Sequence, residues 1–252
     1  MNVSSVTRSN TAIFPLLQIA STSFVFYALF QNYSWKLWLT AYLVYFLNGC
    51  FGVTITFHRL LSHRSFKIHK YLEYLFSFLG AMGGTGSSIG WVAVHKQHHR
   101  YADKTKDPHS PHQSGLKILF SHYVTDFNKW PVRRLITDRF HLFLHNYYHA
   151  ILFTWAIFWL SLGFEFFIFC FAVPMAIQLW ASNLSNWGNH LVGYRNFETV
   201  EKSTNCWWLA LITWGEGWHN NHHKFPNRWS FRVRWWEFDP SAVVIAFLRS
   251  RS

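Results

Sequence analysis

The chain has 252 residues, of which half are hydrophobic, 21% are aromatic and only 13% are charged. An ordinary soluble domain carries about 25% charged residues, so this composition argues against one and indicates a membrane protein. The formal net charge of +12 comes with no nucleic-acid recognition motif. We therefore expect the basic side chains to face anionic lipid headgroups and expect no nucleic-acid partner.

The N-terminal part predicts a helical hairpin. Two apolar stretches, at about 11–30 and 35–57, are long enough to cross a bilayer, and only four residues separate them. The first stretch is too long for a cleavable signal peptide, and the only basic residue before it is Arg8. We expect it to be a retained span.

The middle segment, at about 58–149, is mostly polar and basic. Its one apolar stretch, at 71–90, contains five glycines, so we expect a partly buried or re-entrant segment there instead of a plain span. The spacing of His141, His145 and His149 among aromatic residues favours an interfacial helix face over a metal site. Four isolated histidines are interpreted as ordinary polar side chains: His69, His109, His112 and His122.

A second hairpin is predicted from the apolar stretches at about 150–162 and 164–182, with Gly163 at the turn. Both stretches are short or interrupted for a full crossing. We expect residues 140–149 to extend the third helix and Pro174 to kink the fourth.

The basic residues predict the orientation. Thirteen Lys and Arg lie between Phe57 and His149 and eight lie after Asn189, whereas the hairpin tips carry only Lys36 and Glu165. The positive-inside rule places both termini and the middle segment in the cytoplasm. We therefore expect a single domain, 1–252, with four transmembrane helices and a cytosolic cap formed by 58–149 and 183–252.

Eight histidines lie just outside the apolar stretches. They form one HxxxxH pair and two HxxHH motifs: His58 and His63; His95, His98 and His99; His219, His222 and His223. Positions i, i+3 and i+4 share one helix face, so each HxxHH can converge on one point or two adjacent points. His58 and His63 lie about 140° apart on an ideal helix, so we expect them to converge only where the helix frays or ends.

These histidines predict a site for two metal ions, because one ion rarely takes more than six ligands. Imidazoles suit iron, zinc and copper, and the residues do not distinguish iron from zinc. The motifs contain no cysteine or carboxylate, which argues against an iron–sulfur cluster and a Glu-rich bundle site. Candidate acceptors for the outer imidazole N–H groups are Asp103, Asp107 and Glu216.

Three segments resemble the histidine boxes of the stearoyl-CoA desaturase-like fatty acyl desaturases: HRLLSHRSF, WVAVHKQHHRYADKTKDPHSP and GEGWHNNHHKFP. A fourth, NWGNHLVGYRNFE, resembles the family's NxxxH element, and Trp91 also fits the pattern. The resemblance covers about 49–226. It implies that His190 is a ninth metal ligand and that Asn186 approaches one metal ion through water.

The resemblance also implies an all-α fold whose cap holds two Fe²⁺ ions and whose apolar tunnel takes a fatty acyl chain. The implied reaction is O2-dependent desaturation, of Δ9 type, of an acyl-CoA, an acyl carrier protein or a membrane lipid. We expect a separate electron donor such as ferredoxin or cytochrome b5, because the tail after Pro226 is too short for a fused cytochrome b5.

The tunnel implied by the resemblance has a candidate closed end. Phe46 lies 12 residues before His58, which is about 18 Å deeper along a helix, and Tyr42 is one turn further. We predict that these two side chains limit the acyl chain length, and that Trp91 lines the tunnel near the metal ions.

Two other functions remain open at this point. A di-iron lipid hydroxylase or carotenoid oxygenase shares the spacing of the boxes, although the flanks of the third box favour a desaturase. A non-enzymatic haem carrier or metal transporter is the other alternative. A haem carrier needs paired histidines on facing spans, whereas here the boxes lie at the ends of the spans.

Overall fold

The computed structural model describes residues 4–121 and 125–249, with side chains from residue 13 onward. His122 lies outside the described residues. Within them every regular element is helical, and the only extended pairing is two isolated bridges that join Tyr194 to Asn205 and Asn205 to Trp218. The expected all-α class is confirmed for this part of the chain.

Two helices are long and apolar enough to cross a bilayer, and they span Trp35–Ser62 and Phe164–Gly188. The first consists of α2 (Trp35–Tyr45) and its continuation η1 (Phe46–Ser62). It follows α1 (Ser4–Leu29), whose apolar part, Ile13–Leu29, is shorter, as is the apolar helix α8 (Tyr148–Leu162). Two of the four predicted spans therefore meet the length and hydropathy expected of a membrane helix.

The helix η1 has π-helical winding, and the His63 N–H donates to the His58 carbonyl at 3.2 Å. Hydrogen bonds from i to i+5 bring residues five apart onto one face. The two imidazole rings are accordingly 5.0 Å apart. The helix η1 ends at Ser62 and His63 is its C-cap, so the helix ends between the two histidines as expected, and the π-helical winding of this last turn aligns them.

The glycine-rich stretch forms a partly buried helix, α3 (Lys70–Met82), and the start of α4 (Ser88–Tyr101). The backbones of η1 and α3 touch at Gly52 and Gly80, where a Cβ built on Gly52 would lie 2.2 Å from the Gly80 nitrogen. Only small residues permit such close helix contact. This contact anchors the segment leading into α4 beside η1, which carries the first two histidines.

Five short elements follow α4: α5 (Pro111–Ser114), η2 (Gly115–Phe120), η3 (Phe127–Lys129), α6 (Arg133–Ile136) and α7 (Arg139–Asn146). The expected extension of the third span by residues 140–149 is wrong, because the helix breaks at Tyr147 between α7 and α8. The interfacial interpretation is also wrong for His141 and His145, which are 0% and 3% exposed. They are buried because α7 packs against α3 and α4.

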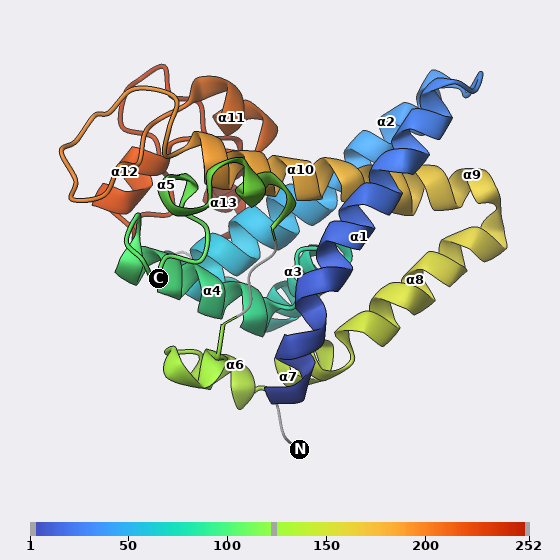
Figure 1. Ribbon diagram of the computed structural model, residues 1–252, viewed down its shortest axis with the longest axis horizontal. Helices are drawn as coiled ribbons and strands as arrows, with labels where there is room; N and C mark the ends of the chain where they lie inside the picture. Colours follow the sequence, from blue (N-terminus) through green and yellow to red (C-terminus); the bar gives the residue numbers. More distant parts are fainter. Residues whose placement is uncertain (1–3, 122–124, 250–252) are drawn as a thin grey trace.

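The fourth apolar helix consists of α9 (Phe164–Phe167), η4 (Ile168–Ala172) and α10 (Val173–Gly188). Its winding changes from π to α immediately before Pro174, which lies in the first turn of α10, where a missing N–H is tolerated. Figure 1 shows α8 and α9 forming the hairpin on the right, from which α10 runs back towards the cap. Because α10 continues to Gly188, it carries Asn186.

The cap is completed by α11 (Trp207–Ile212), α12 (His219–Lys224) and α13 (Pro240–Leu248). Figure 1 places α12 near the end of α4 on the left of the molecule, far from the α8–α9 hairpin. A fully buried ion pair joins the cap to η1, with Arg59 Nη1 2.8 Å from Asp239 Oδ2.

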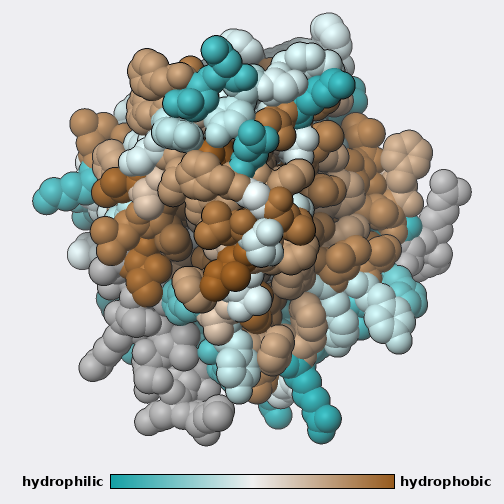
Figure 2. All heavy atoms as spheres, turned by 90° about the vertical axis from the view of Figure 1, so that its right-hand side faces the viewer, coloured by the Kyte–Doolittle hydropathy of each residue, from teal (hydrophilic) through white to brown (hydrophobic). Residues whose placement is uncertain are grey.

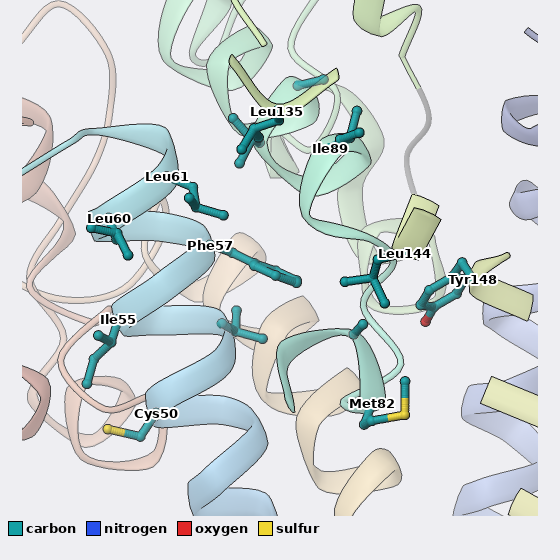
Figure 3. Packing of buried hydrophobic residues seen from close by; sticks show 14 of the residues in the cluster. Cys50, Ile55, Phe57, Leu60, Leu61, Met82, Ile89, Leu135, Leu144 and Tyr148 are labelled. Carbon is teal, nitrogen blue, oxygen red and sulfur yellow. The ribbon is translucent and has the colours of Figure 1, made fainter. Parts of the chain in front are cut away.

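The hairpin end of the molecule has an apolar surface, and Figure 2 shows hydrophobic side chains gathered across the middle of this face. Several large exposed side chains come from the helices at this end: Phe26, Phe30, Trp35, Leu39, Phe153 and Leu162. The core surrounds η1, and Figure 3 shows Phe57 extending from one side of this helix towards Leu144, with Ile55 on the other side. An apolar outer band of this kind fits contact with lipid.

Candidate metal centre

The nine histidines singled out in the sequence meet in two adjacent clusters. Within each cluster one nitrogen per residue lies within 4.8 Å of the others. The five-histidine cluster contains His58, His63, His95, His99 and His222. The four-histidine cluster contains His98, His190, His219 and His223.

Sequence neighbours belong to different clusters. On α4, His98 joins the four-histidine cluster and His99 the five-histidine cluster; on α12, His222 and His223 divide in the opposite order. Consecutive residues lie about 100° apart on a helix, so each helix presents imidazoles to both sides. The two HxxHH motifs therefore serve two adjacent points, the second of the arrangements that their spacing allowed.

The nitrogen separations fit metal coordination. Five pairs of Nε2 atoms face each other: His58–His222 at 3.0 Å, His63–His95 at 2.7 Å, His99–His222 at 2.9 Å, His98–His223 at 3.2 Å and His219–His223 at 3.0 Å. Two imidazoles bound at right angles to one ion, with bonds of about 2.1 Å, would be about 3.0 Å apart. The donor set and its spacing thus suit one ion per cluster.

A neutral imidazole is the form that binds a metal ion. Burial, followed by repulsion from neighbouring imidazoles, keeps the pKa of His95, His98 and His222 well below the usual histidine value. At the edge of the five-histidine cluster, burial lowers the pKa of His63 to about 3.

Three carboxylates orient the imidazoles from outside. Asp107 Oδ1 lies 2.9 Å from His98 Nδ1 and Asp103 Oδ2 lies 2.9 Å from His190 Nδ1, while Glu216 contacts His58 Nδ1. Each carboxylate accepts the Nδ1–H, and this leaves the Nε2 lone pair directed into the cluster. These are the three acidic residues that the sequence suggested for this position.

The carboxylates differ in how readily they ionise. Burial opposes ionisation of Asp103, but hydrogen bonds from His190, the Lys202 N–H and Ser110 outweigh it and hold its pKa below the usual range. Burial raises the pKa of Asp107 to about 6 and that of Glu216 to about 8. A cation bound to the neighbouring imidazoles would favour the charged form of all three.

Sequence reasoning missed three residues beside the site. His109, interpreted as an ordinary polar residue, is buried and its ring lies 4.2 Å from that of His98. Glu201 Oε1 lies 3.7 Å from His223 Nδ1, and Arg59 Nη2 lies 3.5 Å from Glu216 Oε1. His109 lies inside the second box segment, but spacing alone did not separate it from the other isolated histidines.

Both clusters face one continuous cavity inside the protein. Its wall includes His58 and His95 of the five-histidine cluster and His98 and His219 of the four-histidine cluster. Asn186 also lines it.

The predicted tunnel residues differ in their positions. Trp91 lines the cavity and stacks on His95 with ring centroids 5.0 Å apart. Phe46 and Tyr42 do not line the cavity, whereas Trp214 does. Both side chains contact Trp214, with ring centroids 4.9 Å apart for Phe46 and 5.9 Å apart for Tyr42. They form a second layer behind Trp214.

A second depression reaches the five-histidine cluster from the outer surface. Two of the cluster's histidines line it together with four basic side chains. We name it the basic basin and define it by His63, Arg64, Lys96, His99, Arg100 and Lys129. The five-histidine cluster is therefore approached from two sides, by the internal cavity and by this basin.

The chain is similar in sequence to known proteins along most of its length. Residues 33–245 match the family described as "Fatty acid desaturase". The chain is 34% identical to "Acyl-CoA C20 Delta5-desaturase" of Anemone leveillei, over 95% of this chain and 80% of that protein. It is 35% identical to "sn-1 stearoyl-lipid 9-desaturase" of Synechocystis, over 86% and 70%. It is 33% identical to "Delta-9 acyl-lipid desaturase 1" of Arabidopsis thaliana, over 86% and 73%.

Proposed function

This chain belongs to the fatty acid desaturase family, and from that membership we propose that it is an O2-dependent, di-iron desaturase of fatty acyl chains. In the proposed reaction two adjacent methylenes lose two hydrogens and become a cis or trans alkene. O2 takes these together with two electrons and two protons, and two molecules of water are released.

One observation carries the proposal: imidazoles of both clusters lie on the wall of a single internal cavity. A hydrolytic or structural zinc site needs three or four ligands on one ion, whereas here nine imidazoles divide between two points. An iron pair bound there would supply the O2 activation and the hydrogen removal. The relatives named above are all desaturases, which favours desaturation over the hydroxylase and carotenoid oxygenase alternatives.

The protein's own side chains position the substrate and exclude water. Trp91 stacks on His95 and closes the wall next to the five-histidine cluster. Asp103 and Asp107 hold the Nδ1–H groups of His190 and His98, so these rings keep their Nε2 atoms on the cluster. Asn186, on the cavity wall, contacts an ion of the four-histidine cluster through a water molecule in the proposed arrangement.

We propose a four-span membrane topology with both termini and the metal centre on the cytoplasmic side. The two long apolar helices, the two shorter ones and the exposed apolar side chains at the hairpin end support it. The basic residues cluster in the segments that form the cap, which agrees with the positive-inside rule.

The substrate is proposed to be a saturated acyl chain on CoA, an acyl carrier protein or a membrane lipid, with the double bond at a Δ9-type position. Its methyl end would lie at Tyr45 and Trp214, where the cavity wall is backed by Phe46 and Tyr42. Replacing Phe46 with Ala should let Trp214 move back and admit longer chains. An unchanged chain-length preference of the product would contradict this role.

Electrons are proposed to enter through the basic basin from an acidic carrier such as ferredoxin or cytochrome b5. The basin carries Arg64, Lys96, Arg100 and Lys129 around two histidines of the five-histidine cluster, and Lys96 is held by its 2.9 Å bond to the Ser62 carbonyl. Opposite charge steers such a donor to the side of the cluster that the substrate cavity does not use.

The test is expression in a host of known lipid composition, followed by fatty-acid analysis. A new monoene that is absent with His222→Ala and requires O2 is the expected result. Growth under ¹⁸O2 separates the alternatives, because a hydroxylase would leave labelled oxygen in the acyl product. Absence of any new acyl product, or a labelled alcohol as the main product, would overturn the proposal.

A further inference from the structure

The cavity follows one face of α4. Six residues on the cavity wall are spaced as one helical stripe: Ser87, Gly90, Trp91, Val94, His95 and His98. Positions i, i+3, i+4, i+7, i+8 and i+11 lie on the same side of a helix. The cavity therefore runs along the axis of α4, and the rise per residue of the helix gives the distance between two points of its wall.

A buried histidine that belongs to neither cluster lies at the Ser87 end of this stripe. His145 of α7 lines the cavity, is 3% exposed, and its Nδ1 lies 2.6 Å from Ser87 Oγ. Ser87 Oγ already accepts the Gly90 N–H as the cap of α4. The Ser87 hydroxyl hydrogen itself needs an acceptor, and among the described residues His145 Nδ1 is the one within reach. We therefore take the Ser87 hydroxyl as the donor and His145 Nδ1 as the acceptor of this bond.

This bond determines the tautomer of His145. Burial lowers its pKa to about 4, so the ring is neutral, and with Nδ1 accepting, the hydrogen is on Nε2. Nε2 has no hydrogen-bond partner among the described residues. A buried N–H without an acceptor is costly, and on a cavity wall the missing acceptor is a group of the bound ligand or a water molecule that the ligand displaces.

We infer that the His145 Nε2–H donates to the acyl carbonyl oxygen of the substrate and so fixes where the double bond forms. A thioester and a glycerolipid ester share this carbonyl, so the anchor serves either source. The polar side chains of Ser121 and Thr125 line the cavity together with His145, as a polar ester end requires. The inference rests on the proposed desaturase function.

The length of α4 between Ser87 and His95 predicts which carbon atoms of the acyl chain lie beside the metal centre. Ser87 precedes His95 by eight residues, which is about 12 Å at 1.5 Å per residue. An extended chain of carbons with bonds of about 1.5 Å advances roughly 1.25 Å per bond, so this distance corresponds to about ten bonds. With the carbonyl carbon, C1, at Ser87, the first cluster histidine lies beside about C10–C11. A Δ5 position would need roughly half that distance.

The first experiment measures double-bond position in the expression host. His145→Phe keeps a ring but removes the donor, and we expect a mixture of positional isomers because the chain slides along the cavity. His145→Gln keeps an N–H donor and should restore a single position. His141→Gln is the matched control, because His141 is equally buried one turn earlier on α7 but does not line the cavity.

The second experiment measures binding of a ligand with and without the carbonyl. If the wild-type monoene appears in the CoA pool, the pair is stearoyl-CoA and S-octadecyl-CoA; if it appears in a lipid, the pair is the ester-linked and ether-linked stearoyl forms of that lipid. We expect about fivefold weaker binding of the form without a carbonyl, as for one hydrogen bond, and no difference in His145→Phe.

The outcomes separate this inference from the proposed function. A wild-type protein that makes no monoene would overturn the proposed function. A wild-type protein that makes a monoene, with His145→Phe giving the same single isomer and the same preference between the paired ligands, would overturn only the role of His145. In that case a trapped water is the partner of Nε2.

Discussion

The two histidine clusters differ in how the protein supports them. In the four-histidine cluster, three of the four imidazoles have a carboxylate at Nδ1: Asp107 at His98, Asp103 at His190 and Glu201 at His223. In the five-histidine cluster only His58 has one, Glu216. An outer carboxylate makes an imidazole a stronger donor. The smaller cluster thus has fewer ligands, and most of them have a carboxylate beside Nδ1, whereas most of the larger cluster's ligands have none.

The clusters also differ in access. Both contribute to the wall of the substrate cavity, but only the five-histidine cluster reaches the basic basin, through His63 and His99. Under the proposed function, this difference would divide the labour: electrons would arrive at the larger cluster, while both clusters would face the substrate. The following measurements test whether the two clusters are separate sites with these properties.

The largest effect is expected from removing one ligand of each cluster. His222 lies within 3.0 Å of both His58 and His99, and His219 lies 3.0 Å from His223. His222→Ala and His219→Ala should each retain about one of two metal ions and lose more than about a hundredfold in activity, since even outer partners cost 10–100-fold. Metal analysis of the purified variants checks this. Loss of both ions in either variant would show that the clusters are one site.

The next effect concerns the outer carboxylates. Asp103→Asn should lower activity by about 10–100-fold and weaken the metal of the four-histidine cluster alone, whereas Glu216→Gln should act on the other cluster. Turnover, together with the metal content measured at increasing chelator concentration, distinguishes the two variants. Asp126→Asn is the control, because Asp126 is exposed, its one ion pair among the described residues is with Lys129 at 3.6 Å, and its other contact is the Asn128 N–H. Equal metal loss from both clusters in Asp103→Asn would contradict the comparison.

A smaller effect is expected at the basin. The exposed side chains of Arg100 and Lys129 flank His99, and reversing both charges to Glu should slow turnover with ferredoxin or cytochrome b5 by about tenfold at low salt. Turnover driven by a chemical reductant should not change. Arg232→Glu, an exposed charge on the cap outside the basin, should leave both rates unaltered. A substrate KM that rises instead would assign the basin to the head group.

The smallest effect is expected for Asn186, which lines the cavity and is proposed to contact an ion of the four-histidine cluster through water. A contact through water leaves the four imidazole ligands of the ion in place, so Asn186→Ala should retain both metal ions and lose only severalfold in activity. Metal content and turnover are compared with those of His219→Ala. Loss of the ion in Asn186→Ala would make Asn186 a direct ligand and the clusters equal in ligand number.

The histidine boxes were predictable because they depend on local spacing. On a short helix, HxxHH aligns three imidazoles whatever the rest of the chain does, and the structure brings His95 together with His99 and His219 together with His223. The ninth histidine, His190, was found only by resemblance, since nothing in its local spacing distinguishes it from His109. The π-helical winding that aligns His58 with His63 has no signature in the apolar pattern.

The anchor histidine shows where local reasoning fails. The spacing of His141, His145 and His149 and their aromatic neighbours suggested a surface at the membrane interface. Packing of α7 against α3 and α4 instead buries His141 and His145, and Ser87, 58 positions earlier in the chain, orients the ring of His145. Burial of a polar residue depends on distant partners, which a single helix pattern does not reveal.

The sequence by itself determined the histidine donor set, the apolar helices and the family, and it predicted two metal ions. Those features follow from residue type and from spacing within a few turns of helix. The tertiary structure decided which imidazole joins which cluster, which of them line the cavity and which line the basin. These depend on contacts such as His98 with His223, 125 positions apart, and such contacts exist only once the helices have packed.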